Sequence, residues 1–308
     1  MRVTLIHNPK AGRGKASPGA LKKLLRDAGH KLSYHSCKER GWKEALMEPT
    51  DLVVVAGGDG TVGRVARRLT GRGIPIALLP SGTANNIART LGQIEQPFKR
   101  LVRGWPNGRH VKLDVGVAQG PWGERNFIEG VGIGVFASLL TKPARPGAKK
   151  KKKPVEHGLT RLRDLAKRAE PVEVSALLDG RDISGSYLML EAVTLPFVGP
   201  NLHLSPDQKP GDGHFAVVLV TKAERSRLLD YLENWKEDRE ELAMLPSLRG
   251  RRLQIEWTGF PLHIDDKLKP DEGTKAKEMA GRVEARIGGC TVEFLIPGDP
   301  KAKRAPRA

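Results

Sequence analysis

Cysteine is scarce in this sequence, and the two cysteines that it contains lie far apart. Cys37 and Cys290 have neither the close spacing of metal ligands nor the number that a disulfide framework needs in a chain of 308 residues. A disulfide-stabilised secreted protein and a cysteine-based metal site are therefore not expected. The composition favours a reducing, cytoplasmic environment.

Long apolar runs are also missing. No stretch approaches the roughly 18 apolar residues that a membrane-spanning helix requires, and the apolar opening Val3–Ile6 stops at His7. The sequence therefore predicts neither a signal peptide nor a transmembrane helix. Its 39% of apolar residues and its length are sufficient for two globular domains.

Acidic residues are outnumbered by basic ones, and the formal net charge is +18. A field of this size attracts polyanions, namely nucleotides, nucleic acids or anionic lipid surfaces. Aromatic residues make up only 5%, and none interrupts the lysine run Lys149–Lys153, so we expect no nucleic-acid binding. The run is either a solvated loop or a contact with an anionic membrane surface.

The first 110 residues repeat one pattern three times. Apolar segments at 2–7, 51–56 and 74–79 are each followed by a glycine-containing turn and then by apolar residues at helical spacing. Continuous apolar strands that alternate with helices predict a parallel sheet covered on both faces, a three-layer α/β/α domain. In such sheets ligands bind beyond the carboxyl ends of the strands, where all three turns fall.

The pattern changes after residue 110, where short strand candidates are separated by glycine, proline and aspartate turns. They lie at 111–117, 172–178, 187–194, 215–220, 253–257, 283–287 and 292–296. This arrangement predicts an antiparallel β-sandwich, interrupted by helical patterns at 156–169 and 223–238. We therefore expect an α/β domain over 1–110, a β-sandwich domain over 111–297 and a basic tail over 298–308.

The turn after the second strand is the most informative, and it reads Gly57-Gly58-Asp59-Gly60-Thr61. Glycines let backbone amides approach phosphate oxygens, and the following helix N-terminus favours an anion. Asp59 would repel a phosphate unless a metal ion or a substrate hydroxyl lay between them, so it indicates metal or proton handling. The structural alternative is a tight turn in which Asp59 caps a helix.

The turn after the third strand, Ser81-Gly82-Thr83-Ala84-Asn85-Asn86, offers hydroxyl and amide donors, although Ser81 and Thr83 are also ordinary helix caps. The sequence contains neither the P-loop pattern nor a dinucleotide-binding glycine fingerprint after a strand. The glycines of Gly130–Gly134 have the wrong spacing for that fingerprint. We interpret them as sites of close backbone packing.

Taken together, these turns resemble the diacylglycerol kinase and sphingosine kinase superfamily, particularly its bacterial lipid kinases. The resemblance rests on Asn8-Pro9-x-x-Gly12, on the second and third turns, on Phe127–Gly134, and on Val198–Leu202, Ser205–Asp207 and Gly211–Phe215. It implies a nucleotide-binding domain of the NAD kinase and phosphofructokinase type, a β-sandwich lipid domain and an active site between them.

The resemblance also implies ATP as phosphate donor, Mg²⁺ and the residues that bind them. The expected nucleotide-binding residues are Asn8, Gly12, Gly57, Gly58, Gly60, Thr61, Ser81, Gly82, Thr83 and Asn85. Asp59 would act through catalytic magnesium or orient the attacking group. Asp212 would bind a structural magnesium ion, although Gly-Asp-Gly is also an ordinary turn.

Asp265 is the expected catalytic base. The second catalytic signature of the family is Asp-Gly-Glu, and its counterpart here is Asp265-Asp266-Lys267. Asp265 can accept the proton of a lipid hydroxyl, because phosphoryl transfer needs mainly positioning and charge neutralisation. Lys267 in place of a glutamate could hold a phosphate or lower the basicity of Asp265, and Phe136 replaces a common acidic residue.

The expected function is an ATP-dependent lipid kinase that associates peripherally with the membrane from the cytoplasm. Diacylglycerol, phosphatidylglycerol and a sphingoid base all remain candidate substrates, and the sequence leaves the oligomeric state open. One alternative is an NAD kinase, although such enzymes typically carry an Asn-Glu pair where Ser81–Asn86 stands. The other is a lipid-binding regulator that kept the fold and lost catalysis.

Overall fold

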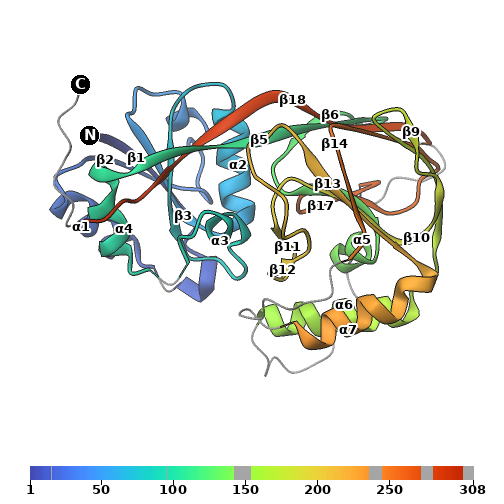
Figure 1. Ribbon diagram of the computed structural model, residues 1–308. Coiled ribbons are helices and arrows are strands. Elements are labelled where there is room, and N and C mark those ends of the chain that lie inside the picture. Colours follow the sequence, from blue (N-terminus) through green and yellow to red (C-terminus); the bar gives the residue numbers. More distant parts are fainter. Residues whose placement is uncertain (15, 95, 142–153, 236–244, 272–279, 301–308) are drawn as a thin grey trace. The chain divides into compact units, whose positions relative to one another are not determined.

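The computed structural model describes residues 1–308 except 15, 95, 142–153, 236–244, 272–279 and 301–308. The chain forms two compact units (Figure 1). Unit 1 contains Met1–Leu113 and the C-terminal segment from Thr291, and unit 2 contains Asp114–Cys290. Within the described residues no helix combines the length and apolarity needed to cross a bilayer. The run Lys149–Lys153 and the tail from Lys301 lie outside the described residues.

Unit 1 is built on a parallel sheet with the strand order β4-β3-β1-β2. Its strands are β1 (Arg2–His7), β2 (Lys31–Ser36), β3 (Leu52–Gly57) and β4 (Ile76–Pro80). Its helices are α1 (Pro18–Asp27), α2 (Asp59–Leu69), α3 (Asn86–Thr90) and α4 (Phe98–Gly104), with short 3₁₀ helices at Ala11–Gly14, Glu44–Leu46 and Trp105–Asn107.

Apolar side chains on both faces of this sheet explain why helices cover it twice. All six residues of β3 are buried. Val54 packs in one cluster with Leu25 of α1 and Leu101 of α4, whereas α2 contacts β3 from the opposite side (Figure 1). The expected three-layer α/β/α architecture is confirmed.

Unit 2 consists mainly of antiparallel strands in two sheets. The first has the order β6-β5-β18-β15-β8-β9 and the second β14-β13-β10-β7-β16-β17, with β10 also pairing with β8. The strands of the first sheet are β5 (Arg109–Gly120), β6 (Gly123–Phe127), β8 (Val172–Leu178), β9 (Arg181–Asp182), β15 (Arg252–Trp257) and β18 (Gly281–Ile296). Those of the second are β7 (Gly130–Gly134), β10 (Gly185–Val193), β13 (Phe215–Thr221), β14 (Ser247–Gly250), β16 (Leu262–Ile264) and β17 (Lys267–Lys269).

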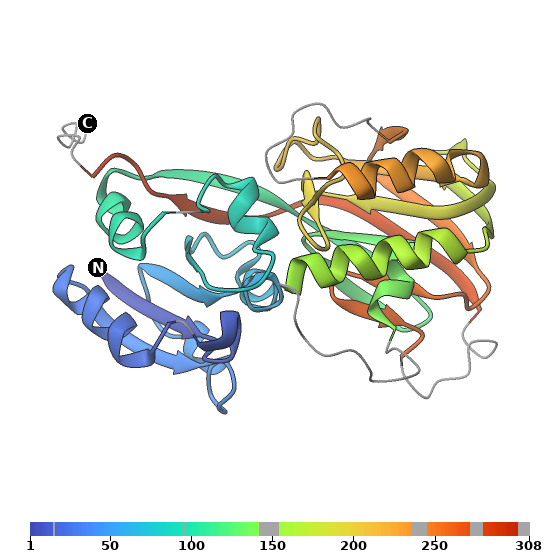
Figure 2. The ribbon, with the colours of Figure 1, turned by 90° about the horizontal axis from the view of Figure 1, so that it is seen from below.

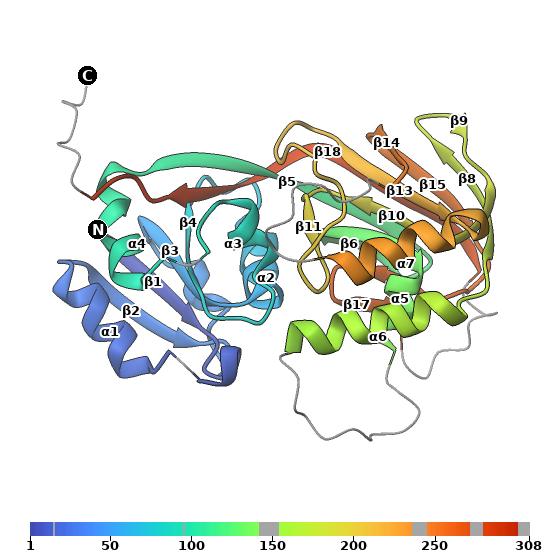
Figure 3. The same cartoon turned by 60° about the horizontal axis from the view of Figure 1, so that its bottom comes forward.

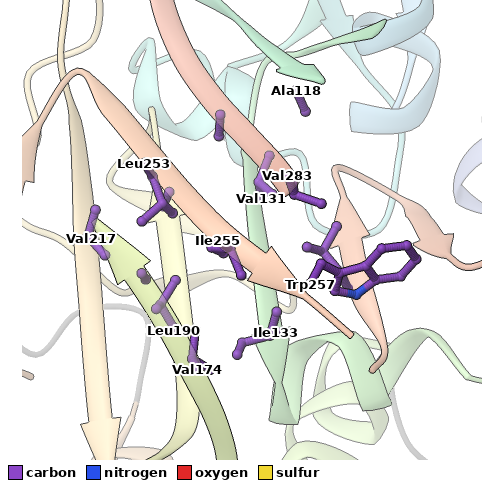
Figure 4. Packing of buried hydrophobic residues seen from close by; sticks show 14 of the residues in the cluster. Ala118, Val131, Ile133, Val174, Leu190, Val217, Leu253, Ile255, Trp257 and Val283 are labelled. Carbon is purple, nitrogen blue, oxygen red and sulfur yellow. The ribbon is translucent and has the colours of Figure 1, made fainter. Parts of the chain in front are cut away.

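The core of unit 2 lies between the two sheets. Val131, Leu190 and Val217 of the second sheet join one buried cluster with Ile255 and Val283 of the first (Figure 4). Because successive residues of a strand point to opposite faces, burial on one face fixes the register of each strand. The expected β-sandwich is confirmed.

A helical layer covers the other face of the second sheet. Its members are α5 (Val135–Leu140), α6 (Pro154–Arg168) and α7 (Arg225–Asn234). The helices α6 and α7 lie side by side (Figures 2 and 3). Val218 of β13 packs with Leu162 and Leu228 in this layer, whereas the adjacent Val217 points to the sandwich core. A small hairpin, β11 (Phe197–Val198) and β12 (Leu202–His203), completes the unit, with a 3₁₀ turn at Lys222–Glu224.

Several features differ from the sequence-based expectation, among them β6, β14 and β17, which were not predicted. The edge strand β2 was not predicted, because its polar residues give it only a weak apolar pattern. Residues 283–287 and 292–296, predicted as two strands, form the single strand β18, whose Phe294 pairs with Ile76 of β4. The segment from Thr291 therefore belongs to unit 1 and not to the second domain, and the first boundary falls at residue 113 instead of 110.

Candidate active site

The three predicted turns of unit 1 lie at one edge of its sheet. Asn8 follows β1, Gly58 follows β3 and Ser81 follows β4. These strands are parallel neighbours, so their carboxyl ends meet at the same edge. A backbone hydrogen bond from Asn8 N to Ala56 O (2.8 Å) and another from Ser81 N to Gly57 O (3.0 Å) fasten the turns to β3.

Glycine is required where the turns touch one another. A Cβ atom on Gly82 would lie 2.3 Å from the Cα atom of Gly58. Gly12 has φ +52°, and a Cβ atom there would lie 2.3 Å from the carbonyl oxygen of Ser81. No side chain fits at either contact, so the edge of the sheet is lined by closely packed backbone.

Polar side chains hold the turns in shape. The Asn8 side-chain amide donates to Oγ1 of the buried Thr61 (3.2 Å). Asn85, in the left-handed region at φ 57°, accepts from the amide of Gly82 (2.9 Å) and donates to the Gly82 carbonyl (3.1 Å). These contacts connect the first turn to the second and close the third upon itself.

Asp59 joins the second turn to the third. Its Oδ1 atom accepts a hydrogen bond from the backbone amide of Ile87 (3.0 Å), in the first turn of α3. Burial raises the pKa of the Asp59 carboxyl above its ordinary value, opposed by the amides of Ile87 and Asn86. The capping role considered from the sequence is thus present, but the capped helix is α3 and not α2, in which Asp59 itself lies.

The remaining predicted nucleotide-binding residues are at the same edge. Gly60 and Thr83 are exposed, and Gly57 is buried because Thr61 packs against it. The hydroxyl oxygen of Ser81 is buried without a hydrogen-bond partner. An unpaired buried hydroxyl is unusual and indicates a site where a ligand or water completes the hydrogen bonding.

Asp265 lies in unit 2, in the two-residue turn between β16 and β17. Its Oδ1 atom accepts from the amides of Glu129 (2.8 Å), Ile128 (3.1 Å) and Gly130 (3.2 Å). Its own amide donates to the carbonyl of Gly130 (2.8 Å), and its φ is 50°. The Asp265 carboxylate is therefore held in one orientation by the backbone that precedes β7.

Lys267 pairs with Asp266, since Nζ lies 3.3 Å from Oδ2. Both side chains are about half exposed, at 52% and 48%. The charge introduced by Lys267 is thus partly neutralised by the neighbouring residue that replaces the family's glycine.

Sequence reasoning missed a buried charged pair beside this turn. Glu191 Oε2 lies 2.8 Å from His263 Nε2, and Nδ1 of His263 lies 3.0 Å from the Asp265 carbonyl oxygen. Burial raises the pKa of Glu191. The signal in the sequence was a single carboxylate within the otherwise apolar strand Tyr187–Val193, because an isolated charge there must find a partner.

The carboxylate of Asp212, the predicted ligand of a structural magnesium ion, has two hydrogen-bond partners in the structure. Oδ1 of Asp212 accepts from the amide of His214 (3.0 Å), and Oδ2 accepts from the guanidinium of Arg249 (2.7 Å). In the described parts of the chain, no three His, Cys, Asp or Glu side chains are grouped so that they could hold an ion. The Asp212 carboxylate therefore has a cationic partner in the guanidinium of Arg249.

Asp114 is buried next to this turn and accepts from the amide of Gly213 (3.0 Å). Burial raises the pKa of its carboxyl, the Gly213 amide lowers it, and the nearby Asp212 raises it further. Sequence reasoning did not identify Asp114, which lies in the middle of β5.

Comparison with known proteins connects these features to one family. The family model of the diacylglycerol kinase catalytic domain matches residues 2–118. This range includes the three turns of unit 1 and ends within β5.

Relatives and solved structures extend the similarity along the chain. A diacylglycerol kinase of Mycobacterium tuberculosis is 26% identical over 291 residues, covering 86% of this chain and 88% of the relative. One from Bacillus subtilis is 27% identical over 231 residues, covering 72% and 74%. A putative diacylglycerol kinase from Bacillus anthracis has the same fold, with a TM-score of 0.72, 22% identity and coverage of 96% and 97%.

Proposed function

We propose that the chain transfers the γ-phosphate of ATP to a hydroxyl group of a membrane lipid, because residues 2–118 match the family model of the diacylglycerol kinase catalytic domain and bacterial diacylglycerol kinases are similar along most of the chain. The observation that carries this proposal is the interlocked set of turns at one edge of the sheet of unit 1. The contact between Gly58 and Gly82 brings two glycine-rich turns together at the carboxyl ends of the strands, and such turns are common binding sites for phosphate groups. The family assignment favours this reading over the NAD kinase alternative.

In this proposal ATP binds at the turns of unit 1. The hydroxyl of Ser81 and the side-chain amide of Asn8 are the proposed hydrogen-bond donors to the phosphates, and Gly12, Gly58 and Gly82 let the three turns pack closely at this edge. The other members of the proposed nucleotide site are Gly57, Gly60, Thr61, Thr83 and Asn85.

Magnesium would neutralise charge on the transferred phosphate. The described residues contain no three-ligand group, so the ion would be held mainly by the nucleotide phosphates, with Asp59 as the candidate protein ligand. One Asp59 oxygen is used by the Ile87 amide, but a carboxylate accepts several hydrogen bonds or a metal at the same time.

Asp265 is the proposed base for the lipid hydroxyl. The amides of Ile128, Glu129 and Gly130 fix the direction of its carboxylate, and a fixed base is what phosphoryl transfer requires. The hydrogen bonds that hold Asp265 also motivate the second candidate function, a regulator without catalysis, in which Asp265 serves only to close the turn. Phosphate transfer by the purified protein separates these two functions.

The test is magnesium-dependent transfer of labelled phosphate from ATP to lipids in mixed micelles. Diacylglycerol is the first substrate to try, followed by phosphatidylglycerol and a sphingoid base, with NAD present as a soluble competitor. We expect Asp59→Ala and Asp265→Ala to abolish labelling. Asp27→Asn is the matched control, because its carboxylate pairs with an exposed lysine on the helix α1.

Each outcome assigns a function. Lipid labelling that requires Asp265 supports the kinase and names the acceptor, whereas labelling of NAD alone supports the NAD kinase. Lipid binding without any phosphate transfer would support the alternative that the protein is a lipid-binding regulator without catalytic activity.

We also propose that the protein associates peripherally with anionic membranes through Lys149–Lys153. The supporting observation is the net charge of +18, to which this run contributes five charges. Vesicles rich in phosphatidylglycerol should bind the protein less tightly in high salt, and less tightly when the five lysines are changed to serine. Equal binding by both proteins at low salt would contradict the proposal.

A further inference from the structure

Three neighbouring strands of unit 2 place Glu191, Gly132 and His263 in one row. Gly132 of β7 pairs with Glu191 of β10 on one side and with His263 of β16 on the other. All three residues are on the face covered by α5, since their neighbours Val131, Leu190 and Ile264 point into the sandwich core. A glycine in the middle strand therefore separates an acid from a histidine.

The missing side chain of Gly132 makes room for the acid to reach the histidine. A Cβ atom on Gly132 would lie 2.1 Å from the Glu191 carboxyl carbon. The Glu191 carboxylate occupies this space and approaches His263 Nε2 to 2.8 Å. Exposed fractions of 1% for Glu191 and 10% for the His263 side chain leave the pair almost without water.

The hydrogen-bond partners fix where the protons lie. His263 Nδ1 faces the Asp265 carbonyl oxygen, which only accepts, so Nδ1 must carry a proton. A second proton lies between Nε2 and the Glu191 carboxylate, which makes the pair neutral as a whole. Burial lowers the pKa of His263, but the charge and hydrogen bond of Glu191 outweigh it and raise that pKa overall.

The pair acts on the turn that holds the proposed base. His263 binds the carbonyl of Asp265, while backbone amides bind the carboxylate of the same residue. Phe136 of α5 lies over the imidazole, with ring centroids 6.4 Å apart and planes inclined by 25°. The imidazole thus has one orientation, and so does the peptide group that follows Asp265.

We propose that Glu191 and His263 are positioning residues that orient the Asp265 turn for phosphoryl transfer. This inference rests on the proposed function, because it gives the pair a role only if Asp265 is the base. Neither side chain touches the substrate in this proposal, and both act through the carbonyl group of Asp265.

Kinetics of isosteric and apolar variants test the role. Glu191→Leu and His263→Leu should lower kcat about 100-fold, since a displaced catalytic group costs that much, and leave the KM for ATP unchanged. Glu191→Gln should retain kcat within about threefold, because its amide can donate to Nε2 of a neutral imidazole while Nδ1 still binds Asp265. The matched control is Glu256→Gln, which removes an exposed carboxylate that pairs with Arg282. Wild-type kcat in Glu191→Leu, or an equal loss in the leucine and glutamine variants, would overturn the proposal.

Nitrogen NMR of histidine-labelled protein provides a readout that does not depend on activity or on a variant that folds poorly. The His263 signals, assigned with His263→Gln, should show a protonated Nδ1 at pH 8. An unprotonated Nδ1 would contradict the hydrogen-bond pattern and with it the positioning role. If the wild-type protein transfers no phosphate although Nδ1 is protonated, the proposed function is wrong, and so is the positioning role that depends on it. The hydrogen bond between Glu191 and His263 would still be supported.

Discussion

The Oδ1 atom of Asp59 lies 3.0 Å from the amide nitrogen of Ile87, and this hydrogen bond connects two turns separated by β4 and the helix α2. A residue expected to handle metal or protons thus also has a structural partner. The two roles are separable by substitution, because asparagine can keep the hydrogen bond and loses the charge.

Asp59→Asn should preserve the fold and remove activity, whereas Asp59→Ala should remove activity and also destabilise the fold. We expect kcat to fall at least about 100-fold in the asparagine variant if Asp59 serves the magnesium ion. The alanine variant should also lose on the order of 1 kcal/mol of unfolding free energy with the hydrogen bond. Chemical denaturation and phosphate transfer measure the two effects, and an asparagine variant with wild-type kcat would leave Asp59 only its structural role.

Gly82→Ala should separate the second and third turns. The new Cβ atom would lie 2.3 Å from Gly58 Cα, so the backbone must move and the affinity for ATP should fall about tenfold or more. Gly19→Ala in α1 is the control, since no atom lies within 4 Å of its Cβ position. That change should stabilise the helix by up to about 1 kcal/mol and leave ATP binding unchanged, as calorimetry with ATP will show.

The Asp212 turn should not need magnesium for its stability, because Arg249 already pairs with its carboxylate. Chelation should leave the melting temperature of the nucleotide-free protein unchanged. Arg249→Gln should lower stability by about 0.5 to 1 kcal/mol, a small effect because the arginine side chain is 58% exposed. A melting temperature that rises with magnesium, and does so only when Asp212 is present, would restore the metal site predicted from the sequence.

Glu284 should make stability depend on pH in the acidic range. Hydrogen bonds from Arg252 lower the pKa of its carboxyl, with Gln254 adding to the effect. A carboxyl whose pKa is lower in the folded state stabilises the fold above its unfolded pKa, and this contribution is lost as the pH falls through the folded pKa. The contribution is on the order of 1 kcal/mol, because the partner arginine is largely exposed.

Glu284→Gln should remove this pH-dependent part. The stability difference between wild type and variant should be constant near neutral pH and shrink on acidification. Denaturant unfolding at pH 7 and at pH 3 measures it. Glu233→Gln is the control, because the Glu233 carboxylate, which also pairs with an arginine, is more exposed than that of Glu284. A difference that stays constant over this range would show that Glu284 does not titrate differently in the folded protein.

The amino-acid sequence by itself determined the class of fold and the candidate nucleotide site. Apolar strands alternating with helices over the first 110 residues predicted the parallel sheet, and the position of the turns at Gly58 and Gly82 directly after two strands predicted that they lie at its carboxyl edge. These features are local in sequence, because a strand, its turn and the helix that follows form one continuous segment. Close backbone packing was predicted for the glycines of Gly130–Gly134. The backbone of Ala192 lies against Gly130 and that of Leu188 against Gly134, whereas Gly132 contacts the Glu191 side chain.

Only the tertiary structure decided which distant residues meet. The pairs of Glu191 with His263, Asp59 with Ile87 and Arg249 with Asp212 join segments far apart in the chain, and periodicity contains no information on such contacts. The same limit explains β18, whose last residues return to the sheet of unit 1 although they read as one more strand of the sandwich. A strand pattern specifies burial, but the partner strand is chosen by packing and hydrogen bonding of the whole fold.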